Sequence, residues 1–304
     1  MSTPPPPLRP RQVLDRLADL GRGESRPAAE LYTLYTLERF LDRLGRTEFR
    51  EDFVLKGGIL LAAYRLRRPT SDIDMQAVDL TLDVAHMNAV IEAVAGVTAD
   101  DGVALDPGST IVRPIRDDDQ YAGLRVVVRE VTLHGRRIPG GLKLDVSTGD
   151  PIWPEATTVR LPGLLGGHIE LLGHPLPTVI AEKTVTVLQR GTQSTRWRDY
   201  VDVRELAQRY SFTAVELRAA GESVAIHRGV DLGPLAAVTA GYGRVGQARW
   251  AAWVARQGLA ASTRADLEDQ VADVVALIDP IYTGAVAPGS IWDPSRGRWD
   301  EHLS

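Results

Sequence analysis

Two aspartates, Asp72 and Asp74, stand one residue apart in a segment whose composition predicts a β-strand over residues 71–78. Because side chains at positions i and i+2 of a strand point to the same face, the two carboxylates project together. Like charges held that close repel each other strongly unless a cation lies between them. Mg²⁺, or Mn²⁺ in its place, takes such oxygen ligands, so the pair predicts a metal site. A solvated acidic strand is the alternative interpretation.

A lysine and two glycines, Lys56, Gly57 and Gly58, stand about a dozen residues upstream of the aspartates. They separate a strand predicted at residues 53–55 from a helix predicted at residues 59–64. Glycine lets the backbone approach a ligand closely, and the free amides at the start of a helix favour anions. The segment therefore predicts a phosphate-binding turn, with plain turn geometry as the alternative.

Three further residues downstream are candidates for the same chemistry. Asp145, in a strand predicted at residues 142–146, could be a third carboxylate of a two-metal site for in-line displacement. Lys143 would share its face, and a surface Lys–Asp pair is the alternative. Lys183 lies in an apolar helix predicted at residues 177–189, and Asp202 shares a helix face with Asp199. Taken singly, the motifs of Lys183 and Asp202 are most simply structural.

Lysine is rare in this chain, with Lys56, Lys143 and Lys183 the only examples among 35 basic side chains. Lysine is a compact point charge that can approach one phosphate oxygen, whereas arginine is a planar fork. All three lysines fall in or beside the motifs above, which supports a phosphate-binding role for those motifs.

The elements that must position these residues follow a simple order along the chain. Helical spacing of apolar residues predicts helices over residues 9–50, and alternating patterns predict a mixed sheet over residues 53–173. Helices return from residue 177 to residue 277, where Asp279 and Pro280 are expected to end the last of them. The pattern predicts an α/β (α+β) chain divided into residues 1–178 and residues 179–304. Residues 1–8 are expected to be a disordered lead-in and the tail from Gly284 to wrap the surface.

Composition excludes several classes of protein. There is no cysteine, so disulfides and thiolate metal sites are ruled out, and no apolar run approaches the ~20 residues that a membrane helix needs. The six histidines show no spacing typical of zinc ligands. The net charge of −5 speaks against a surface that is positive throughout, but it leaves room for a local basic groove. We expect a cytoplasmic protein that does not associate with membranes.

Two stretches resemble the signatures of one known family. Residues 53–61 followed by residues 68–74 are similar to the opening motif of AbiEii/AbiGii-type nucleotidyltransferase toxins. Residues 174–183 followed by residues 196–202 resemble the second signature of that family, whose relatives include the MenT toxins of mycobacterial toxin–antitoxin pairs. The similarity covers about residues 50–210, in the right order and spacing.

The resemblance implies a fold and a set of site residues. It implies a DNA-polymerase-β-like nucleotidyltransferase core with N-terminal helices in residues 1–178, and a helical C-terminal lobe in residues 179–304. It implies that Asp72 and Asp74 bind Mg²⁺ and that Gly57 and Gly58 bind the triphosphate. It also implies that Lys183 contacts the NTP phosphates and that Asp202 completes the active site. Because the third acid varies within the family, Asp145 is predicted as a site residue from its position in the strand and not from the resemblance.

The resemblance also implies a reaction and partners. Family members with a known activity add nucleotides to RNA, notably to tRNA 3′ ends, which blocks aminoacylation. We therefore expect an NTP donor, an RNA acceptor such as tRNA, a cognate antitoxin protein and a monomeric toxin. The alternatives are nucleotidylation of a protein or small-molecule hydroxyl, and a non-catalytic partner-binding protein of the same fold.

One residue departs from the family pattern. Many relatives carry Ser or Thr after the glycine pair, whereas this chain carries Ile59. Thr70 or Ser71 is expected to supply the missing hydroxyl, unless backbone amides hold the donor alone. Six arginines form a candidate basic funnel to an RNA end, with a solvated arginine face as the alternative: Arg65, Arg67, Arg68, Arg190, Arg196 and Arg198. Trp197 or Tyr200 could stack on a base, although a core aromatic is the simpler interpretation.

Overall fold

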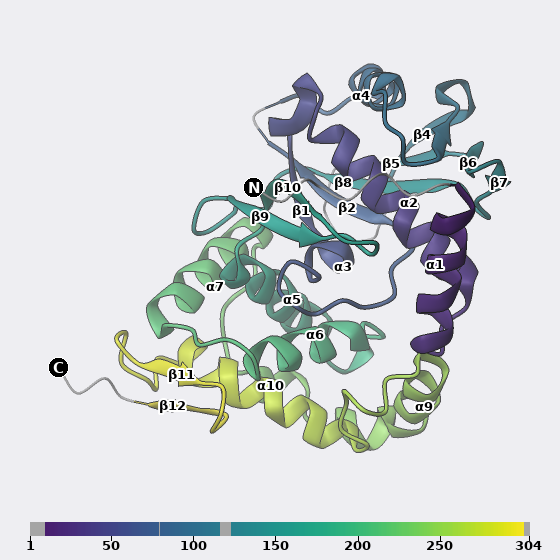
Figure 1. Cartoon of the computed structure of the whole chain (residues 1–304). Coiled ribbons are helices and arrows are strands. Elements are labelled where there is room, and N and C mark those ends of the chain that lie inside the picture. Colours follow the sequence, from purple (N-terminus) through teal and green to yellow (C-terminus); the bar gives the residue numbers. More distant parts are fainter. Residues whose placement is uncertain (1–9, 79, 116–122, 301–304) are drawn as a thin grey trace, which may run out of the picture. The chain divides into compact units, whose positions relative to one another are not determined.

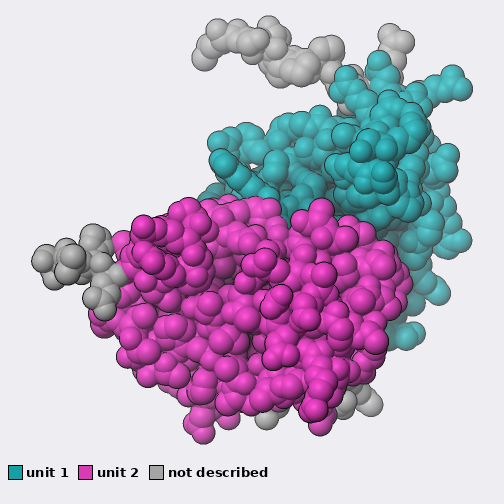
Figure 2. Space-filling model, turned by 90° about the horizontal axis from the view of Figure 1, so that it is seen from below, with its two compact units in different colours: residues 1–149, 157–173 teal, residues 150–156, 174–304 magenta. Residues whose placement is uncertain are grey.

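The computed structural model describes residues 10–78, 80–115 and 123–300. Contacts within the chain define two compact units, coloured separately in Figure 2. Unit 1 comprises residues 1–149 and 157–173, and unit 2 comprises residues 150–156 and 174–304. Helix α5 begins at Leu176, so the division predicted at 178/179 falls within that helix. The lead-in predicted at residues 1–8 lies outside the described residues.

Unit 1 is built on a seven-stranded mixed sheet in the order β4-β5-β8-β2-β1-β10-β9 (Figure 1). Strand β2 runs parallel to β8 and β1 runs parallel to β10, while the other neighbouring pairs are antiparallel. The seven strands are β1 (Phe53–Lys56), β2 (Ile73–Ala77), β4 (Thr110–Pro114), β5 (Gly123–Val128), β8 (Leu142–Ser147), β9 (Thr157–Pro162) and β10 (His168–Gly173).

Helices of the same unit cover one face of this sheet. Helix α2 (Ala28–Leu44) contacts β8 and β10, and α4 (Val84–Gly96) contacts α2 and β4. The leucines of α2 recur at helical spacing, and Leu31, Leu34 and Leu41 are buried. The remaining elements are α1 (Pro10–Gly23), α3 (Gly57–Leu60) and a small sheet of β3 (Val103–Leu105), β6 (Val131–Leu133) and β7 (Arg136–Arg137).

Strand β8 shows how the sheet separates its two faces. Leu142, Leu144 and Val146 are buried, whereas the alternating residues Lys143 and Asp145 are not. The alternation follows from the period of two along a strand, so the apolar residues face the covering helices. The opposite face is left to polar side chains.

Unit 2 is helical, apart from one hairpin. Helix α10 packs against α6, α7, α8 and α9, and α5 packs against α7 (Figure 1). The aromatic side chains of Tyr200, Tyr242 and Trp250 are fully buried in this unit. Its elements are α5 (Leu176–Arg190), α6 (Trp197–Ala207), α7 (Ala214–Arg228), α8 (Leu235–Val238), α9 (Tyr242–Gln257), α10 (Leu267–Tyr282), β11 (Ile291–Asp293) and β12 (Arg298–Asp300).

The C-terminal part corrects two expectations. Helix α10 continues through Pro280, which was expected to end it. The proline removes only one backbone donor, and the helix closes two residues later, where the amide of Thr283 donates to the carbonyl of Asp279. The tail does not merely wrap the surface, because Trp292 of the β11–β12 hairpin is 2% exposed and its indole N–H donates to the carbonyl of Ala207.

The predicted fold class is confirmed: N-terminal helices, a mixed sheet and a helical C-terminal part follow one another. Within the ranges that the structure describes, each helix is too short or too polar to cross a bilayer.

Candidate active site

A row of charged side chains crosses four neighbouring strands of the sheet in unit 1. Lys56 of β1 is the register partner of Asp74 in β2, and Asp74 is the register partner of Asp145 in β8. Asp145 is in turn paired with Arg125 of β5. Side chains at paired positions lie on one face of a sheet, so two adjacent acids are flanked by one base on each side. Asp72 stands just before β2 and adds a third carboxylate.

The glycine turn lies directly against this row. Gly57 has a φ of +65°, and a Cβ at this position would lie 1.9 Å from Oδ2 of Asp74. A Cβ on Gly58 would lie 3.0 Å from both an Arg68 guanidinium nitrogen and Oγ1 of Thr70. Neither position accepts a side chain without displacing a site residue. The absence of a side chain at Gly57 therefore lets the turn pack directly against the Asp74 carboxylate, and its role in phosphate binding stays a prediction.

Asp74 is the carboxylate whose charge is least well compensated. Burial raises its pKa most, repulsion from Asp72 and Asp145 adds to the effect, and Lys56 offsets only part of it, which leaves the pKa at about 6. A buried carboxylate that resists ionisation in this way favours a cation placed beside its oxygens. The site thus fits the divalent metal expected from the sequence.

Asp145 has a partner that competes with a metal. Nε and Nη2 of Arg125 lie 2.7 and 2.6 Å from its two carboxylate oxygens, a bidentate ion pair. Among the described residues, no three acidic or histidine side chains already form a metal-binding group. Asp72 and Asp74 would therefore be the first ligands of Mg²⁺, and Asp145 would join them by exchanging part of its contact with Arg125.

The loop that precedes Asp72 is anchored by a residue that the sequence did not single out. Glu38 of α2 is 0% exposed and accepts from Arg67 at 2.6 Å and from the backbone amide of Leu164 at 2.9 Å. Thr70, in the same loop, lies 3.2 Å from Oδ1 of Asp72 and donates toward it. Glu38 and Thr70 thus fix the segment that leads into the acidic pair.

A second charged cluster lies within unit 2 and joins helices α5 and α6. Nζ of Lys183 is 2.8 Å from Oδ1 of Asp199 and 2.9 Å from Oδ2 of Asp202. Arg196 adds a contact of 2.8 Å to the other oxygen of Asp199. Burial opposes ionisation of Asp199, but Lys183 and Arg196 outweigh it and lower its pKa. Here the charges of buried carboxylates are compensated by bases.

The remaining candidates are divided between the core and the surface. Ile59 is 2% exposed, so the position after the glycine pair is part of the core. Trp197 and Tyr200 are buried as well, which supports the core interpretation over base stacking. Ser71 and Lys143 are exposed beside the site face.

Three arginines of the predicted funnel have polar side-chain partners, and Arg68 and Arg190 also have interaction partners. Arg67 pairs with Glu38, Arg196 with Asp199, and Arg198 donates to Gln257. These three side chains stabilise the fold around them, so they are poorer candidates for a mobile basic surface than the sequence suggested.

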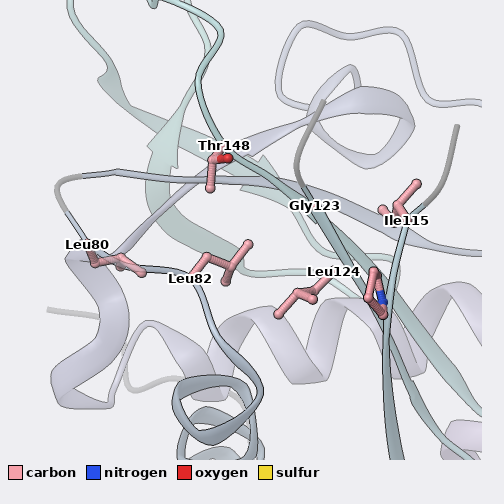
Figure 3. A pocket seen from close by; sticks show the side chains of 7 residues that line it. Leu80, Leu82, Ile115, Gly123, Leu124 and Thr148 are labelled. Atoms are coloured by element: carbon pink, nitrogen blue, oxygen red, sulfur yellow. The ribbon is translucent and has the colours of Figure 1, made fainter. Parts of the chain in front are cut away.

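A cavity of about 480 Å³ opens at the other end of the central strands (Figure 3). Leu80 and Leu82 follow β2, and Thr148 follows β8, whereas Asp72 and Asp74 stand at the start of β2. The cavity is mostly apolar and contains none of the charged residues above. Its position separates it from the acidic row.

Comparison with known proteins agrees with the chemistry of these residues. The family model of the nucleotidyl transferase AbiEii toxin, a type IV toxin–antitoxin system, matches residues 39–274. Among solved structures, the chain is similar to MenT4, a nucleotidyltransferase toxin from Mycobacterium tuberculosis H37Rv, at 20% identity and a TM-score of 0.45, over 71% of this chain and 69% of that chain. No curated protein matches the chain. Because the family match spans well over half of the chain and includes both charged clusters, the protein belongs to the AbiEii nucleotidyltransferase toxin family.

Proposed function

We propose that the protein transfers a nucleotide from an NTP to an RNA acceptor, the tRNA 3′ end, and thereby blocks translation. The observation that carries the proposal is the close packing of Asp74 against Gly57, which places a glycine turn directly beside the carboxylates. That combination can hold a triphosphate and its metal together. The family supplies the reaction class, and the acceptor is part of the proposal.

In the proposed reaction, the acceptor hydroxyl oxygen forms a bond to the α-phosphorus of the NTP. The bond from that phosphorus to the α,β-bridging oxygen breaks, and pyrophosphate leaves with the electron pair. Mg²⁺ (or Mn²⁺) bound at the site would neutralise phosphate charge and lower the pKa of the hydroxyl. The hydroxyl proton passes to a carboxylate, for which Asp145 and Asp202 are the candidates.

The residues of the chain divide the remaining work. Asp72, Asp74 and Asp145 hold the metal, and the backbone at Gly57 and Gly58 receives the phosphates. Lys56 and the hydroxyls of Thr70 and Ser71 border that turn and are proposed to contact the donor. By resemblance, Lys183 offsets charge on the β- and γ-phosphates and Asp202 completes the active site. In unit 2 those two side chains form an ion pair.

A different acceptor is the nearest alternative, because nothing in a donor site specifies the hydroxyl that it modifies. Burial of Ile59 favours a second alternative, since the site lacks the hydroxyl that relatives carry there. A protein with a weakened donor site would bind partners without turnover. A cognate antitoxin, a monomeric state and a cytoplasmic location complete the proposal.

Incubation of the purified protein with Mg²⁺, each labelled NTP in turn and total tRNA tests the proposal. Asp72→Asn serves as the matched control, since it keeps side-chain shape and removes one charge. Label in tRNA with the wild type and not with the variant would support RNA nucleotidylation. Label in protein would support nucleotide transfer but would show that the acceptor is not RNA. If the folded wild-type protein labels nothing, the proposed reaction is wrong.

A further inference from the structure

Helix α9 carries an exposed basic face. Its 16 residues include three arginines, Arg244, Arg249 and Arg256, and no acidic residue. All three arginines are exposed. At 3.6 residues per turn they share one broad arc of the helix with small exposed side chains. The members of that arc are Arg244, Val245, Ala248, Arg249, Ala251, Ala252, Ala255 and Arg256, which we call the α9 face.

The arginines of the α9 face differ from the others in their unit. In the described part of the chain, none of the three makes an ion pair or a side-chain hydrogen bond. Each of the other described arginines of unit 2 has an interaction partner. Three positive charges in a row without carboxylates are therefore a local exception in a protein whose net charge is −5.

The opposite side of the helix is buried and packs against α10, which fixes the orientation of the α9 face. Trp250 is fully buried and stacks on Trp253, with ring centroids 5.4 Å apart. Two glycines let α10 approach closely, because a Cβ on Gly243 would lie 2.5 Å from Cβ of Glu268 and a Cβ on Gly246 would lie 2.6 Å from Leu267. Glu268 is exposed and lies beside Gly243, and within the described residues it forms no ion pair with the arginines of α9.

We propose that the α9 face binds the phosphate backbone of the RNA acceptor. This inference rests on the proposed function, which supplies the RNA acceptor. The inference adds the surface of the protein that binds that RNA. Guanidinium groups bind phosphate through paired hydrogen bonds, and Arg249 and Arg256 stand two helical turns apart. The alanines between them let a phosphodiester chain approach the helix without steric obstruction.

The composition of the face favours RNA over a protein partner. Protein interfaces derive most of their affinity from large anchors such as Trp, Tyr and Arg set in apolar surroundings. The α9 face offers alanine methyl groups and only one larger apolar side chain, Val245 at 57% exposed. Burial of apolar surface would contribute little there, so the binding free energy must come mainly from attraction to a polyanion.

Binding of labelled total tRNA, followed by fluorescence anisotropy at several salt concentrations, tests the proposal. Asp72→Asn serves as the parent, so that no transfer occurs during titration. Changing all three arginines of the face to glutamine should weaken binding roughly 10- to 100-fold, and the dependence of log K on log salt should become shallower by about 2 to 3. A variant with lysine at all three positions should recover part of the affinity, since lysine restores the charge but cannot form the paired hydrogen bonds of a guanidinium group.

The matched control removes three charges elsewhere in unit 2, from arginines with carboxylate partners: Arg218→Gln, Arg296→Gln and Arg298→Gln. It should bind tRNA nearly as the parent does. Equal binding by the α9 and control variants, with the melting temperature retained, would overturn the proposal and leave the proposed function standing. Wild-type protein that neither binds nor labels tRNA would reject both together.

Poly-L-glutamate at equal charge concentration separates RNA from an acidic protein partner. The proposal expects it to bind at least about tenfold more weakly than tRNA, because carboxylates on a flexible chain do not match the phosphate spacing. If it binds as tightly as tRNA and depends equally on the three arginines, the face takes an acidic protein and the RNA assignment is wrong.

Discussion

The acidic row of unit 1 and the lysine cluster of unit 2 use the same residue types in opposite ways. Asp74 lies among other carboxylates, and its pKa is raised to about 6. Asp199 is at least as well buried, yet Lys183 and Arg196 lower its pKa. In the unit 2 cluster, two bases pair with the two buried carboxylates. In the unit 1 row, Lys56 and Arg68 offset only part of the burial and repulsion that disfavour the charge of Asp74.

The ion pairs of unit 2 stabilise the fold by themselves, whereas the charge of Asp74 favours a bound cation. A carboxylate held between bases stabilises the native state, whereas a carboxylate held between acids destabilises it until a cation binds. The glycine turn belongs to the unit 1 row, since the Asp74 carboxylate takes the place of a side chain at Gly57. The comparison predicts that matched substitutions in the two clusters have opposite effects on stability.

Asp74→Asn should impair catalysis more than any other single change considered below. Loss of this ligand should lower nucleotide transfer by about 10³-fold or more, since a catalytic metal contributes several kcal/mol. The same variant should raise the melting temperature by a few degrees at pH 8 without metal, because it removes a charge that folding disfavours. Labelling assays and thermal unfolding measure the two effects.

The pH dependence of that stability gain follows from the direction of the shift. The folded pKa of Asp74 lies above its unfolded value, so the wild-type protein loses stability as pH rises from about 4 through about 6. The gain in Asp74→Asn should therefore be complete above pH 7 and absent below about pH 4. If the variant is less stable than the wild type at pH 8, the charge of Asp74 does not destabilise the folded protein, and the contrast between the two clusters is wrong.

Lys183→Met should have the opposite effect on stability. It leaves Asp199 and Asp202 buried without their shared base, which costs about 3–5 kcal/mol in unfolding free energy. Urea unfolding at pH 7 measures this loss. Because Asp199 has a lowered pKa, the loss should shrink as pH falls through that pKa and Asp199 protonates.

Lys143→Met is the matched control, since Lys143 is exposed on β8. It should change the unfolding free energy by less than about 0.5 kcal/mol. Adding Asp199→Asn and Asp202→Asn to the Lys183 variant should restore most of the lost stability. Equal stability of the two lysine variants would show that the unit 2 cluster is not structural.

The sequence was sufficient for the acidic pair and the glycine turn because both depend on local geometry. Their spacing predicts that Asp72 and Asp74 lie close together, although the strand begins only at Ile73, and a glycine pair between a strand and a helix predicts a tight turn. The family resemblance then connected the two motifs with Lys183 and Asp202. The order of helices and strands followed from periodicity alone.

The partners of these residues were not predictable, because they depend on strand register and on packing between distant segments. Arg125 reaches Asp145 only through the β5–β8 pairing, and Glu38 looks like an ordinary solvated position of an amphipathic helix. Helix α9 begins at Tyr242, with two glycines in its first turns. Gly243 and Gly246 weaken the helical pattern, yet close packing against α10 requires them.

Gly57→Ala should disturb the acidic row through sterics alone. Alanine at a φ of +65° costs about 1–2 kcal/mol, and its methyl group would occupy the place of the Asp74 carboxylate. We expect roughly 100-fold slower transfer with a modest fall in melting temperature. Gly96→Ala, at a position with no atom within 4 Å of the added Cβ, is the control and should leave transfer unchanged. Full activity in Gly57→Ala would mean that the turn does not contact the donor.

The weakest effect is expected at Arg125, whose ion pair makes Asp145 intermediate between the two kinds of carboxylate. The arginine side chain is 56% exposed, so its loss should change the unfolding free energy by at most about 1 kcal/mol. Arg125→Gln frees the oxygens of Asp145, and the Mg²⁺ concentration for half-maximal transfer should fall several-fold. Arg113→Gln is the control, because Arg113 is the register partner of Arg125 and should leave that concentration unchanged. If both variants require as much Mg²⁺ as the wild type, Asp145 is not a metal ligand, and the uncompensated charge of the row resides in Asp72 and Asp74 alone.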